Sequence, residues 1–210
     1  MTRVTAKICG LSTPETLDAA IAGGASHVGL MFYAPSPRAV SFDAAAGLAA
    51  RLPAQVGRVG VFVDPDDALL DAAIAAGKLD AAQLHKVTPE RAAAIRARMP
   101  VWVAVAVKAR ADLDAAANYR NAADKILYDA KTPDGALPGG MGLRFDWSLL
   151  DGFRHPLPWA LSGGLTPVNV TEAARRTGAT LVDVSSGVES APGVKDVDKI
   201  AAFLKAVAQC

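Results

Sequence analysis

The sequence has little net charge, and it contains no long apolar run. Its 22 basic and 21 acidic side chains leave a formal net charge of +1. Neither a basic excess nor a basic run is present to attract nucleic acid or an acidic membrane. No stretch approaches the roughly 18 to 20 apolar residues of a membrane span, and the first residues lack the apolar segment of a secretory signal. We therefore expect a cytoplasmic protein with neither a nucleic-acid partner nor a membrane partner.

Metal-ligand patterns are also missing. The two cysteines, Cys9 and Cys210, lie near opposite ends of the chain, which is not the spacing of a disulfide or zinc framework. The three histidines, His27, His85 and His155, lack ligand spacing as well. No glycine-rich dinucleotide turn follows the first expected strand. The sequence thus predicts no metal site and no cofactor, and nothing in it identifies a protein partner.

Hydrophobic residues make up 51% of the chain and charged residues 20%, which is the composition of a globular protein and excludes disorder. Short apolar runs alternate with alanine-rich stretches along its whole length. The expected strands are residues 4–9, 27–32, 58–63, 81–85, 101–107, 124–129, 159–162 and 180–185. Helices are expected to open at Thr13-Pro14, Asp64-Pro65, Thr88-Pro89 and Thr166-Pro167, where a capping side chain precedes a proline. A short helix near 146–150 follows a loop over residues 131–143, and a last helix covers 196–208.

This order predicts about eight strand–helix units, without a linker between them. Repeated strand–helix order implies parallel strands joined by right-handed crossovers. In 210 residues each unit has roughly 26, which fits a small closed barrel. We therefore expect an α/β fold in which residues 1–210 form a single (β/α)8 TIM barrel, with a doubly wound open sheet as the alternative.

In such barrels the functional groups lie where the strands end. Polar side chains end several of the apolar strands, and these are the candidates: Cys9, Gln83, His85, Asp129, Asp183 and Ser185. Three of them also have an ordinary structural explanation. Cys9 could be a small core residue, Asp129 a turn cap and His85 a hydrogen-bonded core histidine. Since side chains alternate along a strand, Lys7 should share a face with Cys9, and Lys125 with Asp129.

Two glycine-bearing loops predict a phosphate site. Residues 161–165 follow the seventh expected strand, and residues 184–189 follow the eighth. Glycine lets backbone N–H groups approach an anion, and the loops after strands seven and eight commonly bind phosphate in this barrel class. Either loop alone could be an ordinary turn, but both at these places favour phosphate.

Seven segments, in order along almost the whole chain, resemble the phosphoribosylanthranilate isomerase family of tryptophan biosynthesis. They are residues 7–10, 36–38 with 40–41, 83–85, 129–130, 139–142 with 145–147, 161–165 and 183–189. Three positions depart from the family pattern. Met141 stands where threonine is usual, Lys86 where glycine is usual, and Tyr128 where an aliphatic residue is usual.

The resemblance implies a reaction and a role for each matching residue. The reaction is an Amadori rearrangement of N-(5-phosphoribosyl)anthranilate to 1-(2-carboxyphenylamino)-1-deoxyribulose 5-phosphate, which needs no cofactor. Cys9 would be the general base and Asp129 the general acid. Arg38 would bind the anthranilate carboxylate, with Gln83, His85 and Asp183 also binding substrate. The expected phosphate-binding residues are Gly140, Gly142, Gly163, Gly164, Ser186 and Gly187.

These roles require shifted pKa values. A thiol with a pKa of about 8.5 is only a few per cent ionised at pH 7, so a base at Cys9 needs a lower pKa, which Lys7 could supply. An acid at Asp129 needs a pKa raised to about 6 or 7 by burial or by a nearby negative charge such as the thiolate, while Lys125 would oppose this if close. Rival interpretations are a related histidine-pathway isomerase, a ribulose-phosphate epimerase and a non-catalytic phosphate-binding barrel. The epimerase would require metal-ligand histidines, and the histidine-pathway enzyme typically has an aspartate where Cys9 stands.

Overall fold

Eight parallel strands form a closed barrel in the computed structural model, which describes residues 3–133 and 139–210. Residues 134–138 of the predicted loop 131–143 lie outside the described residues. The strands are β1 (Thr5–Cys9), β2 (His27–Met31), β3 (Gly57–Val63), β4 (Ala81–His85), β5 (Val101–Val107), β6 (Lys125–Ala130), β7 (Trp159–Leu161) and β8 (Leu181–Val184). Pairing of β1 with β8, where Lys7 lies opposite Asp183, closes the sheet. The predicted TIM barrel is confirmed, and the open-sheet alternative is wrong.

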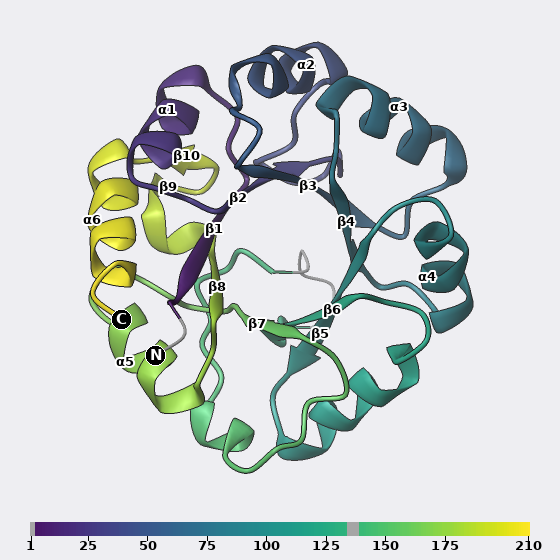
Figure 1. Ribbon diagram of the computed structural model, residues 1–210, viewed down its shortest axis with the longest axis vertical. Coiled ribbons are helices and arrows are strands. Elements are labelled where there is room, and N and C mark those ends of the chain that lie inside the picture. Colours follow the sequence, from purple (N-terminus) through teal and green to yellow (C-terminus); the bar gives the residue numbers. More distant parts are fainter. Residues whose placement is uncertain (1–2, 134–138) are drawn as a thin grey trace.

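Helices surround the barrel in the view along its axis (Figure 1). They are α1 (Pro14–Ala22), α2 (Phe42–Arg51), α3 (Asp67–Gly77), α4 (Pro89–Arg96), α5 (Val170–Thr177) and α6 (Val197–Val207). In the described part of the chain, further connections contain the 3₁₀ helices η1 (Arg110–Tyr119), η2 (Trp147–Leu150) and η3 (Ser186–Val188). A small antiparallel pair, β9 (Glu189–Ala191) and β10 (Val194–Lys195), lies between η3 and α6. Neither η1 nor this pair was predicted from the sequence.

Two of the predicted helix starts are confirmed by their caps. The Thr13 hydroxyl accepts a hydrogen bond from the Thr16 N–H, and the Thr88 hydroxyl accepts one from the Arg91 N–H. Each threonine thus satisfies a backbone donor that the first helical turn leaves unpaired, and the proline that follows it has no such donor to lose.

The starts predicted at Asp64-Pro65 and Thr166-Pro167 are wrong. Asp64 has a φ of +43°, which ends the strand in a left-handed turn, and α3 begins only after the cap formed by Asp66. Before α5, the Asn169 side chain accepts from the Thr166 N–H and donates to the Gly164 carbonyl. These bonds hold residues 166–169 as a turn, so the helix begins at Val170.

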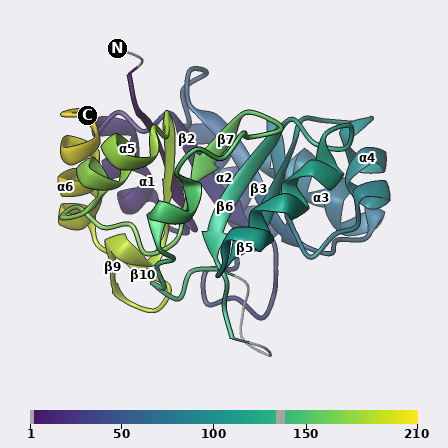
Figure 2. The same ribbon diagram turned by 90° about the horizontal axis from the view of Figure 1, so that it is seen from below.

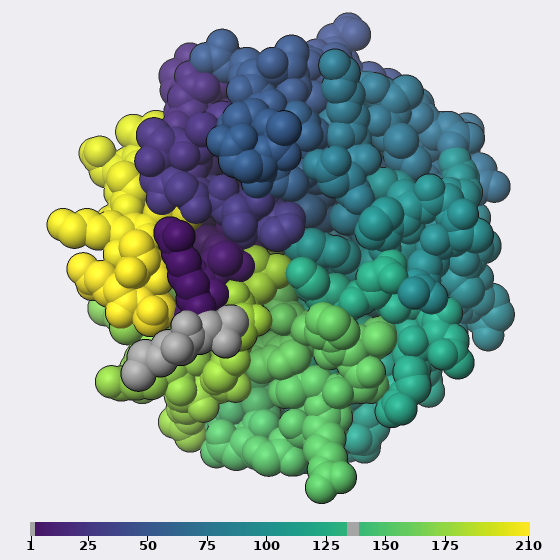
Figure 3. Space-filling view, in the orientation of Figure 1, coloured from purple at the N-terminus to yellow at the C-terminus, as the bar shows by residue number. Residues whose placement is uncertain are grey.

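The barrel interior is filled, apart from its mouth. A cluster of buried residues packs along the axis: Val59, Ala81, Trp102, Leu127, Ala160 and Leu181. In the side view, β6 points toward the end at which the long loops lie, and both chain termini lie at the other end (Figure 2). Figure 3 looks onto the end that carries the termini, where the N-terminal residues lie beside α6. No helix among the described residues has both the length and the apolar character required to cross a membrane.

Candidate active site

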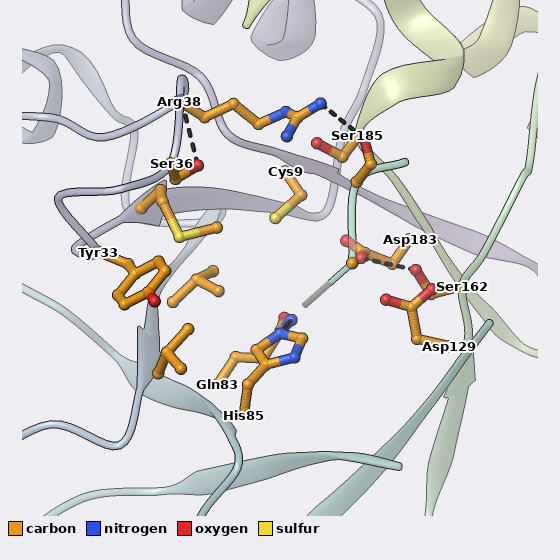
Figure 4. A pocket seen from close by; sticks show the side chains of 15 residues that line it. Cys9, Tyr33, Ser36, Arg38, Gln83, His85, Asp129, Ser162, Asp183 and Ser185 are labelled. Atoms are coloured by element: carbon orange, nitrogen blue, oxygen red, sulfur yellow. Dashed lines mark hydrogen bonds between the residues drawn. The ribbon is translucent and has the colours of Figure 1, made fainter. Parts of the chain in front are cut away.

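A pocket opens where the barrel strands end, and every strand-end candidate lines it: Cys9, Gln83, His85, Asp129, Asp183 and Ser185. Arg38 from the loop before α2 also lines the pocket. Figure 4 shows the Cys9 sulfur and the Asp129 carboxylate directed into the pocket from different sides. Its apolar wall, Met31, Tyr33, Val61 and Val63, comes from β2, β3 and the loop after β2. Sequence reasoning missed this wall because Met31, Val61 and Val63 look like ordinary strand residues and Tyr33 lies in a loop.

Cys9, the last residue of β1, is 5% exposed. Gly29 on β2 lies beside it, where a Cβ would come within 2.9 Å of the Cys9 Sγ, so the absence of a side chain there leaves room for the sulfur. Burial raises the pKa of the Cys9 thiol, although the Lys7 charge favours the thiolate. The expected cation is therefore present, but in the free protein it does not outweigh burial.

Lys7 and Asp183 form a buried ion pair beneath the pocket. The Lys7 Nζ lies 2.7 Å from the Asp183 Oδ1, and the Ser162 hydroxyl donates to Oδ2 at 3.2 Å. Burial alone would lower the pKa of Lys7, but the charges of Asp183 and Cys9 outweigh it and raise that pKa. Lys7 thus remains a cation although its side chain is fully buried.

Asp129 has the character of an acid that is protonated near neutrality. Burial, assisted by the negative charge of Asp183, raises its pKa to about 7, because a buried carboxylate loses its hydration. The value lies in the range that the sequence interpretation required. The cause differs in one respect, because the neighbouring negative charge is Asp183 rather than the Cys9 thiolate. Lys125 lies at the first residue of β6, with its Nζ 4.1 Å from the centre of the Trp102 ring.

Gln83 and His85 project into the pocket from the same face of β4. The Gln83 amide nitrogen lies 3.1 Å from the His85 Nε2. Burial lowers the pKa of His85 to about 4, so its imidazole is neutral. The Gln83 Oε1 is buried and has no hydrogen-bond partner among the described residues. A ligand hydroxyl can satisfy this oxygen.

Arg38 is held by contacts that sequence reasoning did not anticipate. Its Nε and Nη2 donate to the two carboxylate oxygens of Glu189 at 2.7 and 2.8 Å, and Nη2 also donates to the Gly140 carbonyl. Glu189 accepts from Lys195 as well. Neither Glu189 nor Lys195 was among the predicted site residues. A lysine in a short two-stranded pair and a glutamate after a glycine loop have no signal of their own in a single sequence.

A second cavity adjoins the first and contains all of the predicted phosphate-binding residues. Its lining includes Gly140, Gly142, Gly163, Gly164, Ser186 and Gly187, besides Asp129 and Asp183. Gly187 has to be glycine, because a Cβ there would overlap the Leu165 carbonyl oxygen. The structure therefore brings the loops after β6, β7 and β8 together around a polar hollow.

Of the three departures from the family pattern, Met141 lines this cavity, whereas Lys86 and Tyr128 do not. Lys86, which stands where glycine is usual, has a φ of +56°, so it adopts the left-handed turn that glycine forms more easily. Met141 is exposed on the rim. Tyr128 is fully buried and packs against Phe153 and Trp159.

A closed parallel barrel with a polar pocket at the carboxyl ends of its strands defines a TIM-barrel enzyme. A sequence model of the N-(5'phosphoribosyl)anthranilate (PRA) isomerase family matches residues 6–206. The chain belongs to this family and is an isomerase.

Individual relatives agree with this assignment. The isomerase of Zymomonas mobilis subsp. pomaceae is 55% identical and aligns over 97% of this chain and 98% of its own length. The crystal structure of phosphoribosyl anthranilate isomerase from Thermotoga maritima is 39% identical, with a TM-score of 0.88 over 99% of this chain and 100% of that chain. A structure of phosphoribosyl anthranilate isomerase in complex with reduced 1-(o-carboxyphenylamino)-1-deoxyribulose 5-phosphate is 38% identical, with a TM-score of 0.83 and the same coverage.

Proposed function

We propose that this chain, acting as one barrel domain over residues 1–210, converts N-(5-phosphoribosyl)anthranilate into 1-(2-carboxyphenylamino)-1-deoxyribulose 5-phosphate. Two adjoining cavities support the proposal, one with an apolar wall beside Arg38 and one lined by backbone of three loops. The first suits a carboxylated aromatic ring, and the second suits a phosphate. The sugar would lie between them, where Asp129 and Asp183 line both cavities.

Asp129 starts the reaction as the general acid. It donates its proton to the furanose ring oxygen, and the bond from that oxygen to C1 breaks to leave a cationic Schiff base. The pKa of about 7 keeps about half of the Asp129 side chains protonated near neutrality. An unshifted aspartate would be protonated in only about one molecule in a thousand at pH 7.

Cys9 then acts as the general base and removes the proton from C2. The electron pair of the C2–H bond forms the C1–C2 double bond and neutralises the iminium nitrogen. The resulting enolamine takes a proton at C1 and loses its enol proton to give the ketone. Burial disfavours the Cys9 thiolate in the free protein, but the positive Schiff base beside it favours a negative sulfur. The base is thus activated mainly when the intermediate has formed.

The remaining polar residues hold the substrate in place. Arg38 would bind the anthranilate carboxylate through Nη1, which has no hydrogen-bond partner within residues 3–133 and 139–210. Gln83, His85 and Asp183 would bind the sugar hydroxyls. Backbone N–H groups around Gly164, Ser186 and Gly187 would hold the phosphate, in the manner of anion sites built from loop amides.

The observation that carries the proposal is the shared pocket of Cys9 and Asp129. Single-turnover decay of phosphoribosylanthranilate fluorescence tests it with Cys9→Ser and Asp129→Asn. Each variant should react about 10²–10⁴ times more slowly, which is the usual contribution of a general acid or base. Cys210→Ser and Asp114→Asn change an exposed cysteine and an exposed aspartate, and both should retain the rate of the unmodified protein.

A near-native rate in either Cys9→Ser or Asp129→Asn would remove that residue from its assigned role. If the unmodified protein bound the substrate without converting it, the chain would be a binding protein instead of an isomerase.

A further inference from the structure

Glu189 joins several loops of the barrel mouth. Its two carboxylate oxygens accept from Arg38, which lies before α2, and from Lys195 on β10. Oε2 also accepts from the Gly193 N–H between β9 and β10. Lys195 in turn donates to the Ser185 carbonyl at 3.0 Å and to its hydroxyl at 3.2 Å. Ser186, the next residue, begins the loop that we propose binds the phosphate.

The charges of this cluster do not balance. Two cations, Arg38 and Lys195, share the single carboxylate of Glu189, and all three side chains are at most 7% exposed. One positive charge therefore remains at the pocket wall, away from bulk water. Buried charge is unfavourable unless it is paired, so the cluster suits a ligand that brings one further anionic group.

The contacts also fix the plane of the guanidinium. The Glu189 carboxylate accepts hydrogen bonds from Nε and Nη2 of Arg38, and the Gly140 carbonyl accepts another hydrogen bond from Nη2. The backbone of Gly140 lies against the group closely enough that a Cβ there would be 2.5 Å from Nη1. Only the edge at Nη1 has no hydrogen-bond partner in the described part of the chain. Because a guanidinium donates in its own plane, the two N–H groups of Nη1 are held in that plane and can donate only within it.

We propose that Glu189 is a positioning residue that turns Arg38 toward the carboxylate of the substrate and so makes the site selective for a ligand with a second anionic group besides its phosphate. This inference rests on the proposed function. Lys195 supplies the surplus charge and links the cluster to the loop around Ser186. A purely structural Glu189 would stabilise the loops without changing which ligands bind.

Ligand pairs that differ in one carboxylate test this role. The probes are reduced 1-(2-carboxyphenylamino)-1-deoxyribulose 5-phosphate and its counterpart made with aniline, measured by calorimetry. The unmodified protein should prefer the carboxylated probe by at least about tenfold, as expected for one charge-assisted contact. Arg38→Ala should abolish this preference. Glu189→Gln should reduce it to less than about threefold while leaving the affinity for the aniline probe within about twofold.

Two further variants complete the comparison. In the Arg38→Ala background, Glu189→Gln should cause no additional change in preference, because the two residues act through one contact. Asp18→Asn breaks the half-exposed pair between Asp18 and Arg51 and should leave the preference unchanged. Where Glu189→Gln does not fold, Glu189→Asp takes its place and should retain only part of the preference, since the shorter side chain reaches Arg38 less well.

An equal loss of affinity for both probes, or an unchanged preference in Glu189→Gln, would overturn the proposal. The fluorescence assay of the unmodified protein separates this failure from failure of the proposed function. Turnover of phosphoribosylanthranilate together with an unchanged preference rejects the role of Glu189 alone.

Discussion

The Cys9 side and the Asp129 side of the pocket are about equally buried, but burial has opposite consequences for them. It raises the pKa of both groups. For Asp129 a raised pKa favours the protonated form that an acid requires. For Cys9 it disfavours the thiolate that a base requires.

The difference explains where the charged residues lie. The Asp129 side requires only burial, and the nearby Asp183 charge acts in the same direction. The Cys9 side requires a cation, and Lys7 and Lys195 both favour its thiolate. Asp183 pairs with Lys7 at 2.7 Å, so the same carboxylate that assists the acid also holds the cation that assists the base. Burial alone thus favours the protonated form of an acid in this pocket. A base in the same pocket needs a nearby cation, which here is held in place by an ion pair.

Removal of the Lys7 cation should give the largest effect on this comparison. Lys7→Met leaves Asp183 buried without its cation, and we expect the free energy of unfolding to fall by about 3–5 kcal/mol. The ionisation of Cys9 should move to higher pH at the same time. Urea unfolding measures the first effect. The pH dependence of alkylation by iodoacetamide, in a Cys210→Ser background so that only Cys9 reacts, measures the second.

The double variant Lys7→Met/Asp183→Leu is the matched control for stability. Replacing both partners of a buried ion pair with apolar residues is often neutral, so most of the lost stability should return. An alkylation profile that does not move in Lys7→Met would show that this lysine does not act on the thiol.

Much of this fold could be predicted from the sequence, because it depends on local patterns. The strands at residues 81–85 and 101–107 were predicted with the bounds that the structure has. The caps at Thr13 and Thr88 follow from side chains three residues from their partners. The helix η1 was missed, because most of its apolar residues are alanines, which do not mark a buried helix face as larger apolar residues do. The Asn169 turn was missed because Thr166-Pro167 carries the same start signal as a true helix.

The candidate site was predictable as a set of residues but not as a set of contacts. The rule that functional groups lie where the strands end was enough to select Cys9, Asp129 and Asp183 as candidates. The pairing of Lys7 with Asp183 joins residues 176 positions apart, and it depends on barrel closure and on the register between β1 and β8. Arg38 and Glu189 are 151 positions apart. Such contacts leave no local pattern, so the partner of each charged side chain could be assigned only from the structure.

A smaller effect is expected when the acid itself is made permanently neutral. The pKa of Asp129 is about 7 in the folded chain and about 3.9 in an unfolded chain. The folded state therefore binds more protons between these values, and stability falls as the pH rises from 4 to 7. Asp129→Asn removes this loss, so its stability relative to the unmodified protein should grow by up to about 4 kcal/mol over that range and stay constant above it. Urea unfolding at a series of pH values measures the difference.

Asp114→Asn serves as the comparison for this series, because Asp114 is exposed. The difference in stability between Asp114→Asn and the unmodified protein should stay the same across this pH range. Parallel stability curves for Asp129→Asn and the unmodified protein would mean that Asp129 is not protonated by burial in the folded chain.

The smallest effect should come from Lys125→Met, the same substitution made at the opposite end of the barrel interior. Lys125 lies four residues before Asp129 on β6, which places it about 13 Å away along the strand, and its Nζ lies over the Trp102 ring. Loss of this cation–π contact should lower the free energy of unfolding by about 0.5–1 kcal/mol. Neither the alkylation profile of Cys9 nor the pH dependence of stability due to Asp129 should move. A shift in either one, comparable to that of Lys7→Met, would show that the pocket responds to any cation in the barrel and that the position of Lys7 beside the sulfur is not what matters.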